Sequence, residues 1–245
     1  METSRRQFIQ TSAVAATVGA LGLSARADEQ ENIPENRGRI YKAVKGGGRG
    51  GKERMIKQLN GLKELGFDGV ESVSPGISNR DDFVAAIKET GMPAHGVVDM
   101  VHWNQRLSSP DAAIREKGRK ALEQAVRDAH YIGGSSVLLV PGRVAGEKET
   151  HEDVWNRSIE EVRKVLPVAG YLGIHILIET VWNGFCYDPE KFRDYIDAFN
   201  SPWVGAYFDI GNMQKFAPAH EWIRILGKRT VKLDVKDWGV KPGFC

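Results

Sequence analysis

The stretch His175-Ile-Leu-Ile-Glu179-Thr-Val-Trp-Asn183 decides how this chain is interpreted. Its first residues can be buried and run directly into a carboxylate, which is typical of a buried parallel strand with an acid at its carboxyl end. The same pattern recurs at 204–209 and 230–234, which end in Asp209 and Asp234. In a barrel of eight parallel strands the chemistry lies at the carboxyl ends of the strands. We therefore expect the strand ends to carry the function.

The rest of the chain alternates between strand and helix patterns. We expect strands at 39–44, 68–73, 94–99, 136–141, 175–180, 203–209 and 230–236, with helices at 52–65, 81–89, 111–132, 149–169, 188–199 and 219–227. Such alternation favours a parallel α/β fold, and 245 residues with 41% hydrophobic side chains suit a single domain. A complete barrel needs an eighth strand. We therefore expect a (β/α)8 TIM barrel at 39–245 with its last βα unit missing from this chain.

The first 27 residues have the features of an export signal. Arg5 and Arg6 are followed by Gln-Phe-Ile, then by an uncharged apolar run at 13–23, and Ala25-Arg-Ala27 matches a cleavage site. The paired arginines resemble the twin-arginine type. A membrane anchor is the alternative, but the run is short for a bilayer. We expect a signal peptide at 1–27, a flexible leader at 28–38, and an exported protein of the bacterial periplasm, with no membrane association after cleavage.

Charge and cysteine content exclude some classes of protein. Removing residues 1–27 takes away three arginines and one glutamate, so that the 34 basic and 32 acidic residues become 31 of each. A neutral domain offers no bulk electrostatic attraction for nucleic acid. Cys186 and Cys245 are too few for a disulfide framework. Packing must therefore hold the fold together.

Five motifs together resemble the xylose isomerase-like family of TIM barrels, in the sugar phosphate isomerase/epimerase branch that includes hydroxypyruvate isomerases and ketose 3-epimerases. The resemblance covers roughly residues 39–244, and no single motif is specific, whereas their order and spacing are. The motifs are Glu71 in Gly-Val-Glu, Pro141-Gly142, Ile178-Glu179 with Asn183, Asp209-Ile-Gly-Asn212, and Lys232-Leu-Asp234-Val-Lys236-Asp237.

The resemblance implies a divalent metal at the barrel mouth. The family holds it with a Glu after strand five, an Asp after strand six, a His after strand seven and a Glu after strand eight. By position the first two are Glu179 and Asp209, and Asp234 stands in the place of the His. All-oxygen ligands favour Mg²⁺ or Mn²⁺ over Zn²⁺. The eighth-strand Glu falls beyond the end of this chain.

The resemblance also implies roles in moving a proton beside a carbonyl group, which needs a base over the carbon and an electrophile at the oxygen. Glu179 is expected to be both ligand and proton carrier, which makes it the catalytic residue. The expected substrate-binding residues are Asn212, Lys236, Glu71, His95, Asn183 and Trp182.

A plainer interpretation stands beside each assignment. A strand-end acid can simply cap the next helix or form an ion pair, and for Asp234 the candidate ion-pair partners are Lys232 and Lys236. His95 and His102 can equally be core or surface residues, and aromatic residues in barrels commonly serve packing alone.

Three functions remain open. The leading one is a metal-dependent isomerase or epimerase of a sugar, sugar phosphate or related hydroxy-ketone. The second is a non-catalytic exported sugar-binding barrel, and the third is a phosphodiesterase resembling endonuclease IV, whose zinc site requires many histidines. A small sugar is the expected partner, a homo-oligomer is left open, and the identity of the sugar depends on pocket shape.

Export yields the first prediction. Changing Arg5 and Arg6 together to lysine should leave the precursor in the cytoplasm, because the paired arginines are what the twin-arginine machinery recognises. Cell fractionation followed by immunoblotting measures this. Export of the double variant at the wild-type level would show that the twin-arginine interpretation is wrong.

Overall fold

The structure is a computed structural model that describes residues 40–239, so the expected signal peptide and leader at 1–38 lie outside the described residues. The strands are β1 (Ala43–Lys45), β2 (Gly69–Ser74), β3 (Ala94–Asp99), β4 (Ser136–Leu139), β5 (His175–Ile178), β6 (Val204–Asp209) and β7 (Thr230–Asp234). The helices are α2 (Lys52–Glu64), α3 (Arg80–Thr90), α4 (Ala112–Tyr131), α5 (His151–Leu172), α6 (Pro189–Ala198), α7 (Ile210–Met213) and α8 (Ala219–Leu226), with a 3₁₀ turn at Gly227–Arg229.

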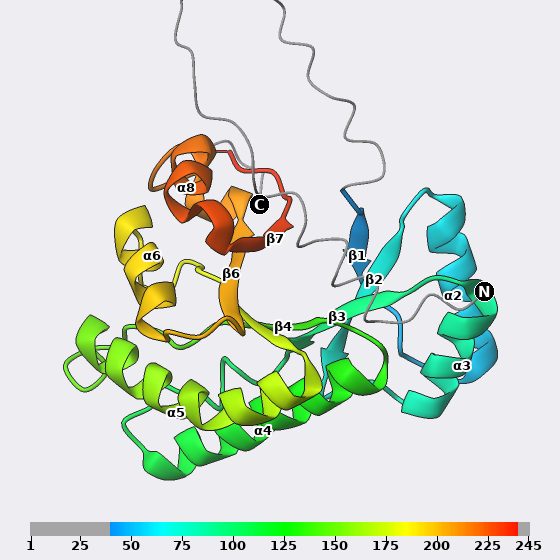
Figure 1. The fold of residues 1–245 in the computed structure, drawn as a ribbon, viewed down its shortest axis with the longest axis horizontal. Helices are drawn as coiled ribbons and strands as arrows, with labels where there is room; N and C mark the ends of the chain where they lie inside the picture. The colour runs from blue at the N-terminus through cyan, green and yellow to red at the C-terminus, as the bar shows by residue number, and fades with distance from the viewer. Residues whose placement is uncertain (1–39, 240–245) are drawn as a thin grey trace, which may run out of the picture. The chain divides into compact units, whose positions relative to one another are not determined.

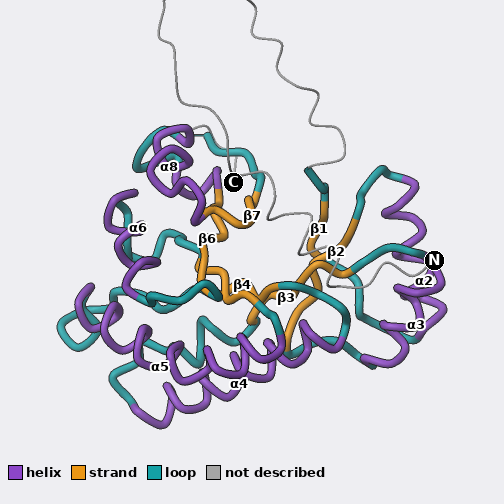
Figure 2. Tube along the Cα trace, in the orientation of Figure 1, coloured by secondary structure: helices purple, strands orange, loops and turns teal. Residues whose placement is uncertain are grey.

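The seven strands form one parallel sheet in the order β1 to β7, so that each strand pairs with its neighbours along the chain. Figure 1 shows these strands following an arc with the longer helices on its outer side, and Figure 2 shows the same separation of strands from helices. The predicted parallel α/β fold of the TIM-barrel type is thereby confirmed.

Apolar side chains fill two separate layers. The larger layer lies between the sheet and the helices and includes Phe208 of β6 and Trp222 of α8, both fully buried. The smaller one consists of Leu138, Leu177 and Tyr207 on β4, β5 and β6, with Val98 packed against them. Because neighbouring residues of a strand point to opposite faces, β3, β4, β5 and β6 each contribute to both layers. This explains the continuous burial of β4 and β6.

The observed elements differ from the expected ones at several ends, and β4, β5 and β7 stop two residues earlier than expected, at Leu139, Ile178 and Asp234. β1 is a short strand at Ala43–Lys45, and it ends where glycines with positive φ begin, at Gly47 (78°) and Gly48 (71°). Helix α5 continues past Pro167 to Leu172 because its buried face is held in the core and outweighs the missing backbone donor. The single-turn helix α7 was not expected.

Helix caps confirm several expected boundaries. Asp111, predicted to begin the long helix, accepts a hydrogen bond from the Ala113 amide at 2.8 Å. Thr150 and Asp153 form a reciprocal capping box at the start of α5. Within residues 40–239, the structure contains no helix with the length and apolar character needed to span a bilayer.

The second prediction concerns Trp222, whose ring stacks on Phe208 at 5.7 Å between centroids. Its indole nitrogen is buried and finds no hydrogen-bond partner among the described residues. Trp222→Ala should lower the free energy of unfolding by about 3–5 kcal/mol through the cavity that it leaves. Trp222→Phe should cost clearly less, because it keeps an aromatic ring and removes the unpaired donor. Urea unfolding monitored by circular dichroism compares the two, and equal losses would contradict this account.

Candidate functional site

The structure brings three strand-end carboxylates together. Glu179 directly follows β5, and Asp209 and Asp234 are the last residues of β6 and β7. The register pairs Asp209 with Asp234 across the β6–β7 ladder. One carboxylate oxygen from each of the three residues lies within 4.8 Å of the others. A parallel ladder places carboxyl ends side by side, so adjacent strands that each end in an acid concentrate negative charge at one point.

The two oxygens of Asp209 have different surroundings. Oδ1 accepts a hydrogen bond from the Asn212 amide at 2.7 Å, which caps helix α7. Oδ2 lies 2.9 Å from the Lys236 ammonium but not in hydrogen-bonding geometry, and the side chain is fully buried. The cap that the sequence offered as the plain alternative is therefore present, and it leaves the second oxygen without a hydrogen bond.

Asp234 forms an ion pair that the sequence did not indicate. Lys45 Nζ donates to Asp234 Oδ2 at 2.5 Å, and this contact joins the last residue of β1 to the last residue of β7. The sequence offered Lys232 and Lys236 as partners instead. Lys45 was missed because the first strand was expected to end at residue 44, whereas β1 ends at Lys45.

Glu179 is buried, with 7% of its surface exposed. Burial raises the pKa of its carboxyl to about 8, and the negative charges of Asp209 and Asp234 act in the same direction against the opposing effect of Lys45. A group with this pKa exchanges its proton near neutral pH. Glu179 therefore has the properties of an acid/base group.

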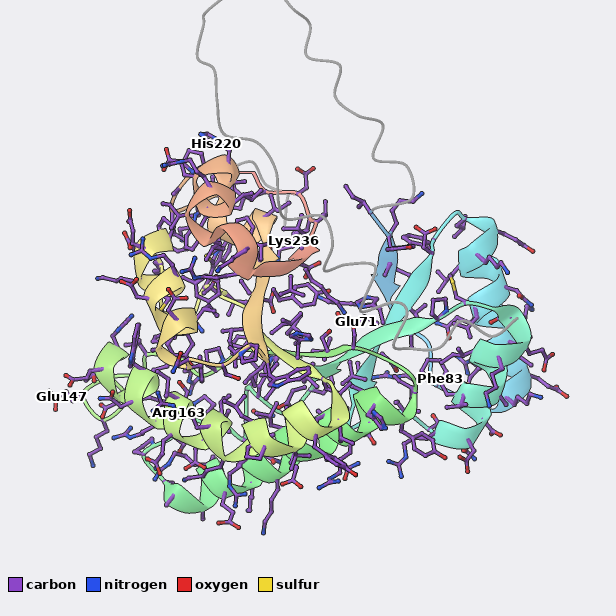
Figure 3. The ribbon with its side chains drawn as sticks, viewed as in Figure 1. Glu71, Phe83, Glu147, Arg163, His220 and Lys236 are labelled. Carbon is purple, nitrogen blue, oxygen red and sulfur yellow. The ribbon has the colours of Figure 1, made fainter. Side chains whose placement is uncertain are left out.

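Glu71 lies inside the sheet rather than at a strand end. It is the third residue of β2 and is 1% exposed, and Figure 3 labels it on the inner side of the arc of strands. Tyr207 OH donates to its Oε2 at 3.3 Å, while Oε1 has no hydrogen-bond partner among the described residues. Burial raises its pKa to about 7, against the charges of Lys232 and Lys45.

His95 is not brought to the carboxylates. It is the second residue of β3, four residues before the carboxyl end of that strand. Lys232 Nζ lies 2.5 Å from His95 Nδ1 and donates to His95 O at 3.0 Å and to Ser136 Oγ at 2.6 Å. Burial and the Lys232 charge lower the pKa of His95 to about 4, so the ring is neutral and accepts from the ammonium. This side chain belongs to the polar interior of the sheet.

The loops that follow β4, β5 and β6 place the other predicted residues. Asn183 donates to Gly142 O at 2.7 Å and accepts from the Phe185 amide at 3.1 Å, so both ends of its amide hold loops together. Trp182 is 54% exposed, and its indole nitrogen donates to Asn212 O at 2.7 Å. The backbone of Asn212 therefore links Trp182 to Asp209, whereas Asn183 serves loop structure.

A buried ion pair fixes two further loops at the same end of the sheet. Arg106, after β3, donates from Nε and Nη2 to the two carboxylate oxygens of Glu149 at 2.9 and 2.8 Å. Ser108 Oγ donates to Glu149 Oε1 at 2.6 Å. Such bidentate pairing holds the loop after β3 against the loop before α5. Neither Arg106 nor Glu149 carried a sequence motif.

Asp99 is a further acid that sequence analysis did not single out. It is the last residue of β3 and is 2% exposed, and its Oδ1 accepts from the Val101 amide at 3.1 Å. Burial raises its pKa to about 7. The strand-end pattern that identified Glu179 would also have found it.

Comparison with known proteins places the chain in a family. Residues 59–243 match the family described as the xylose isomerase-like TIM barrel. The chain belongs to this family, as the parallel sheet with acids at its carboxyl edge indicated.

Individual relatives are more distant. The L-ribulose-5-phosphate 3-epimerase UlaE of Escherichia coli O1:K1 is 25% identical over 175 residues, which are 66% of this chain and 60% of the relative. This chain thus spans about three fifths of the length of the curated relatives that it matches first. Among solved structures, the 3-keto-D-glucoside 4-epimerase YcjR from E. coli superimposes with a TM-score of 0.71 at 17% identity, covering 81% of this chain and 80% of that one. The D-allulose 3-epimerase from Methylomonas sp. in complex with D-allulose gives 0.66 at 18% identity, covering 80% and 72%. At these identities the structural likeness shows the fold.

The third prediction follows from the raised pKa of Glu179. Because the folded chain holds this proton more tightly than the unfolded chain, the group contributes stability below about pH 4.5 that is lost as pH rises through about 8. With chelator present, the free energy of unfolding should fall over this range, with Glu179 contributing on the order of 5 kcal/mol. Glu179→Gln should flatten the profile measured by urea unfolding. Glu147→Gln, on the exposed surface, should reproduce the wild-type slope; a wild-type slope in Glu179→Gln would contradict the assignment.

Proposed function

We propose that the protein is a metal-dependent isomerase or epimerase of a sugar or a related hydroxy-ketone, acting by proton transfer next to a carbonyl group. The observation that carries the proposal is the convergence of Glu179, Asp209 and Asp234, with one oxygen each within 4.8 Å of the others. Carboxylates held this close repel one another, and a divalent cation between them relieves the repulsion. The names of UlaE and YcjR, both epimerases, support the reaction class.

The donor set fits a divalent ion. Asp209 Oδ2 is buried without a hydrogen bond, and its one ion-pair partner among the described residues is the partly exposed Lys236 ammonium at 2.9 Å, which an ion could replace. Three carboxylates offer only oxygen ligands, which favours Mg²⁺ or Mn²⁺ over Zn²⁺. A bound ion would polarise the substrate carbonyl. Glu179, Asp209 and Asp234 are the residues that would hold it.

Proton transfer, charge stabilisation and contact with the substrate are assigned to side chains of the chain itself. Glu179 has a pKa of about 8, so its carboxyl can take up and return a proton at neutral pH. Lys45 is close enough to Glu179 and Asp234 for their charges to raise the pKa of its ammonium, which places a positive charge beside the proton carrier. Trp182 is half exposed and is bonded to the backbone of Asn212, whose amide donates to Asp209, and an exposed indole suits the C–H side of a sugar ring. Together they bind, orient and deprotonate a small hydroxylated carbonyl compound.

A non-catalytic sugar-binding barrel is the second candidate. Its support is that Lys45 and Lys236 each approach one of the three carboxylates, and an internal counter-charge of this kind also relieves the repulsion. As part of either function, we propose export to the bacterial periplasm by the twin-arginine route, supported by Arg5 and Arg6.

The fourth prediction tests the proposed reaction on a panel of ketoses and ketose phosphates. The full chain with Mn²⁺ should exchange the hydrogen next to the carbonyl of at least one of these compounds for deuterium in D₂O, followed by proton NMR. Glu179→Gln should abolish exchange.

Mn²⁺ should raise the melting temperature, because an ion that binds only the folded state stabilises it. Asp209→Asn should lose most of that rise, whereas Glu147→Gln should keep it. Sugar binding without exchange, together with no thermal effect of Mg²⁺, Mn²⁺ or Zn²⁺, would favour the sugar-binding candidate.

A further inference from the structure

Two lysines, one near each end of the described chain, form ion pairs with the carboxylate cluster of Glu179, Asp209 and Asp234. Lys236 Nζ lies 2.9 Å from Asp209 Oδ2, and Lys45 Nζ lies 2.5 Å from Asp234 Oδ2. Figure 3 labels Lys236 beside β7. Glu179 has no lysine contact of this kind within residues 40–239. Two of the three carboxylates therefore have an ammonium partner, and the third does not.

At Asp209 the two oxygens are not equivalent. Oδ1 is committed to the Asn212 amide at 2.7 Å, and this bond caps helix α7. Oδ2 accepts no hydrogen bond, so it has the greater free capacity for a cation, and it is the oxygen that Lys236 faces. Gly211 keeps Lys236 close, since a Cβ at position 211 would meet Lys236 Cγ at 2.6 Å and Lys236 O at 2.8 Å. A metal ion and this ammonium therefore compete for one atom.

The lysines, not the carboxylates, are free to move. The side chains of Lys236 and Lys45 are 42% and 48% exposed, whereas that of Asp209 is fully buried. A long, partly exposed lysine can turn its head group into water at little cost. Asp209 has no such freedom, because it is anchored by its cap. A cation that enters the cluster would therefore displace ammonium groups and leave the carboxylates in place.

We propose that Lys236 and Lys45 are exchangeable counter-ions that occupy the ligand oxygens of Asp209 and Asp234, and that they set the affinity of this site for a divalent ion. This inference rests on the proposed metal site and adds its control by the chain's own residues. Each lysine opposes metal binding by holding an oxygen that the ion needs. Each also stabilises the folded chain when no metal is supplied, because it neutralises a carboxylate that folding has placed beside two others.

The test is calorimetric titration of the full chain with MnCl₂ alone. Lys236→Met and Lys45→Met should each lower the dissociation constant about tenfold, which corresponds to about 1.4 kcal/mol. Lys236→Arg keeps the charge and should retain the wild-type constant more closely than Lys236→Met. Lys52→Met is the matched control, because Lys52 forms a comparable ion pair with Glu89 at 3.1 Å, is 45% exposed and lies outside the cluster. In EDTA, Lys236→Met should melt below both the wild type and Lys52→Met.

The outcomes separate the two proposals. Tighter Mn²⁺ binding by both cluster variants, with no change in Lys52→Met, supports the exchange. Binding by the wild type with equal or weaker binding in folded Lys236→Met and Lys45→Met would overturn the exchange and leave the metal site standing. If neither the wild type nor any lysine variant bound an ion, the metal site itself would fall, and the exchange with it. Circular dichroism at the titration temperature verifies that each variant is folded.

Discussion

The rest of this site depends on the electrostatic repulsion between carboxylates that a parallel ladder brings together. β5, β6 and β7 are adjacent, and Asp209 pairs with Asp234 in the β6–β7 ladder, so the acids at these strand ends lie close to one another. Buried carboxylates at such separations are unfavourable unless they are protonated, paired or bound to a cation. The chain uses the first two solutions: burial raises the pKa of Glu179, and Lys236 and Lys45 approach Asp209 and Asp234.

Polar side chains in the interior of the sheet are likewise held by their neighbours. Glu71, Tyr207, Lys232 and His95 form a polar group around the small apolar layer of Leu138, Leu177 and Val98. Lys232 donates to a carbonyl, a hydroxyl and a neutral imidazole, which satisfies the ammonium without a carboxylate in direct contact. Burial lowers its pKa to about 8. This polar group lies beneath the carboxylates, and Glu71 is close enough to Lys45 and Asp234 for their charges to act on its pKa.

Rigid loops complete the carboxyl edge of the sheet. The Arg106–Glu149 pair joins the loop after β3 to the loop before α5, and Asn183 joins the loops after β4 and β5. Trp182 is bonded to the Asn212 carbonyl and so stands in a fixed position despite its exposure. A site that must orient a small polar molecule benefits from walls that do not need to be ordered on binding.

The sequence by itself determined the parallel α/β fold, the order of the seven described strands and the three acids at the ends of β5, β6 and β7. These follow from local patterns: apolar runs that end in a carboxylate, glycines that end helices, and caps such as Asp111, whose partner amide is two residues away. The cap on Asp209 is equally local, since the Asn212 amide is three residues on.

Only the tertiary structure decided how deeply the long polar side chains are buried and which partners they have. Lys45 meets Asp234 across 189 residues, and His95, on a strand correctly predicted, lies far from the end of that strand and is held by Lys232. The alternation of a strand tells which residues share a face. Which residues of neighbouring strands lie side by side depends on the register between strands, and this register shifts between β2 and β3.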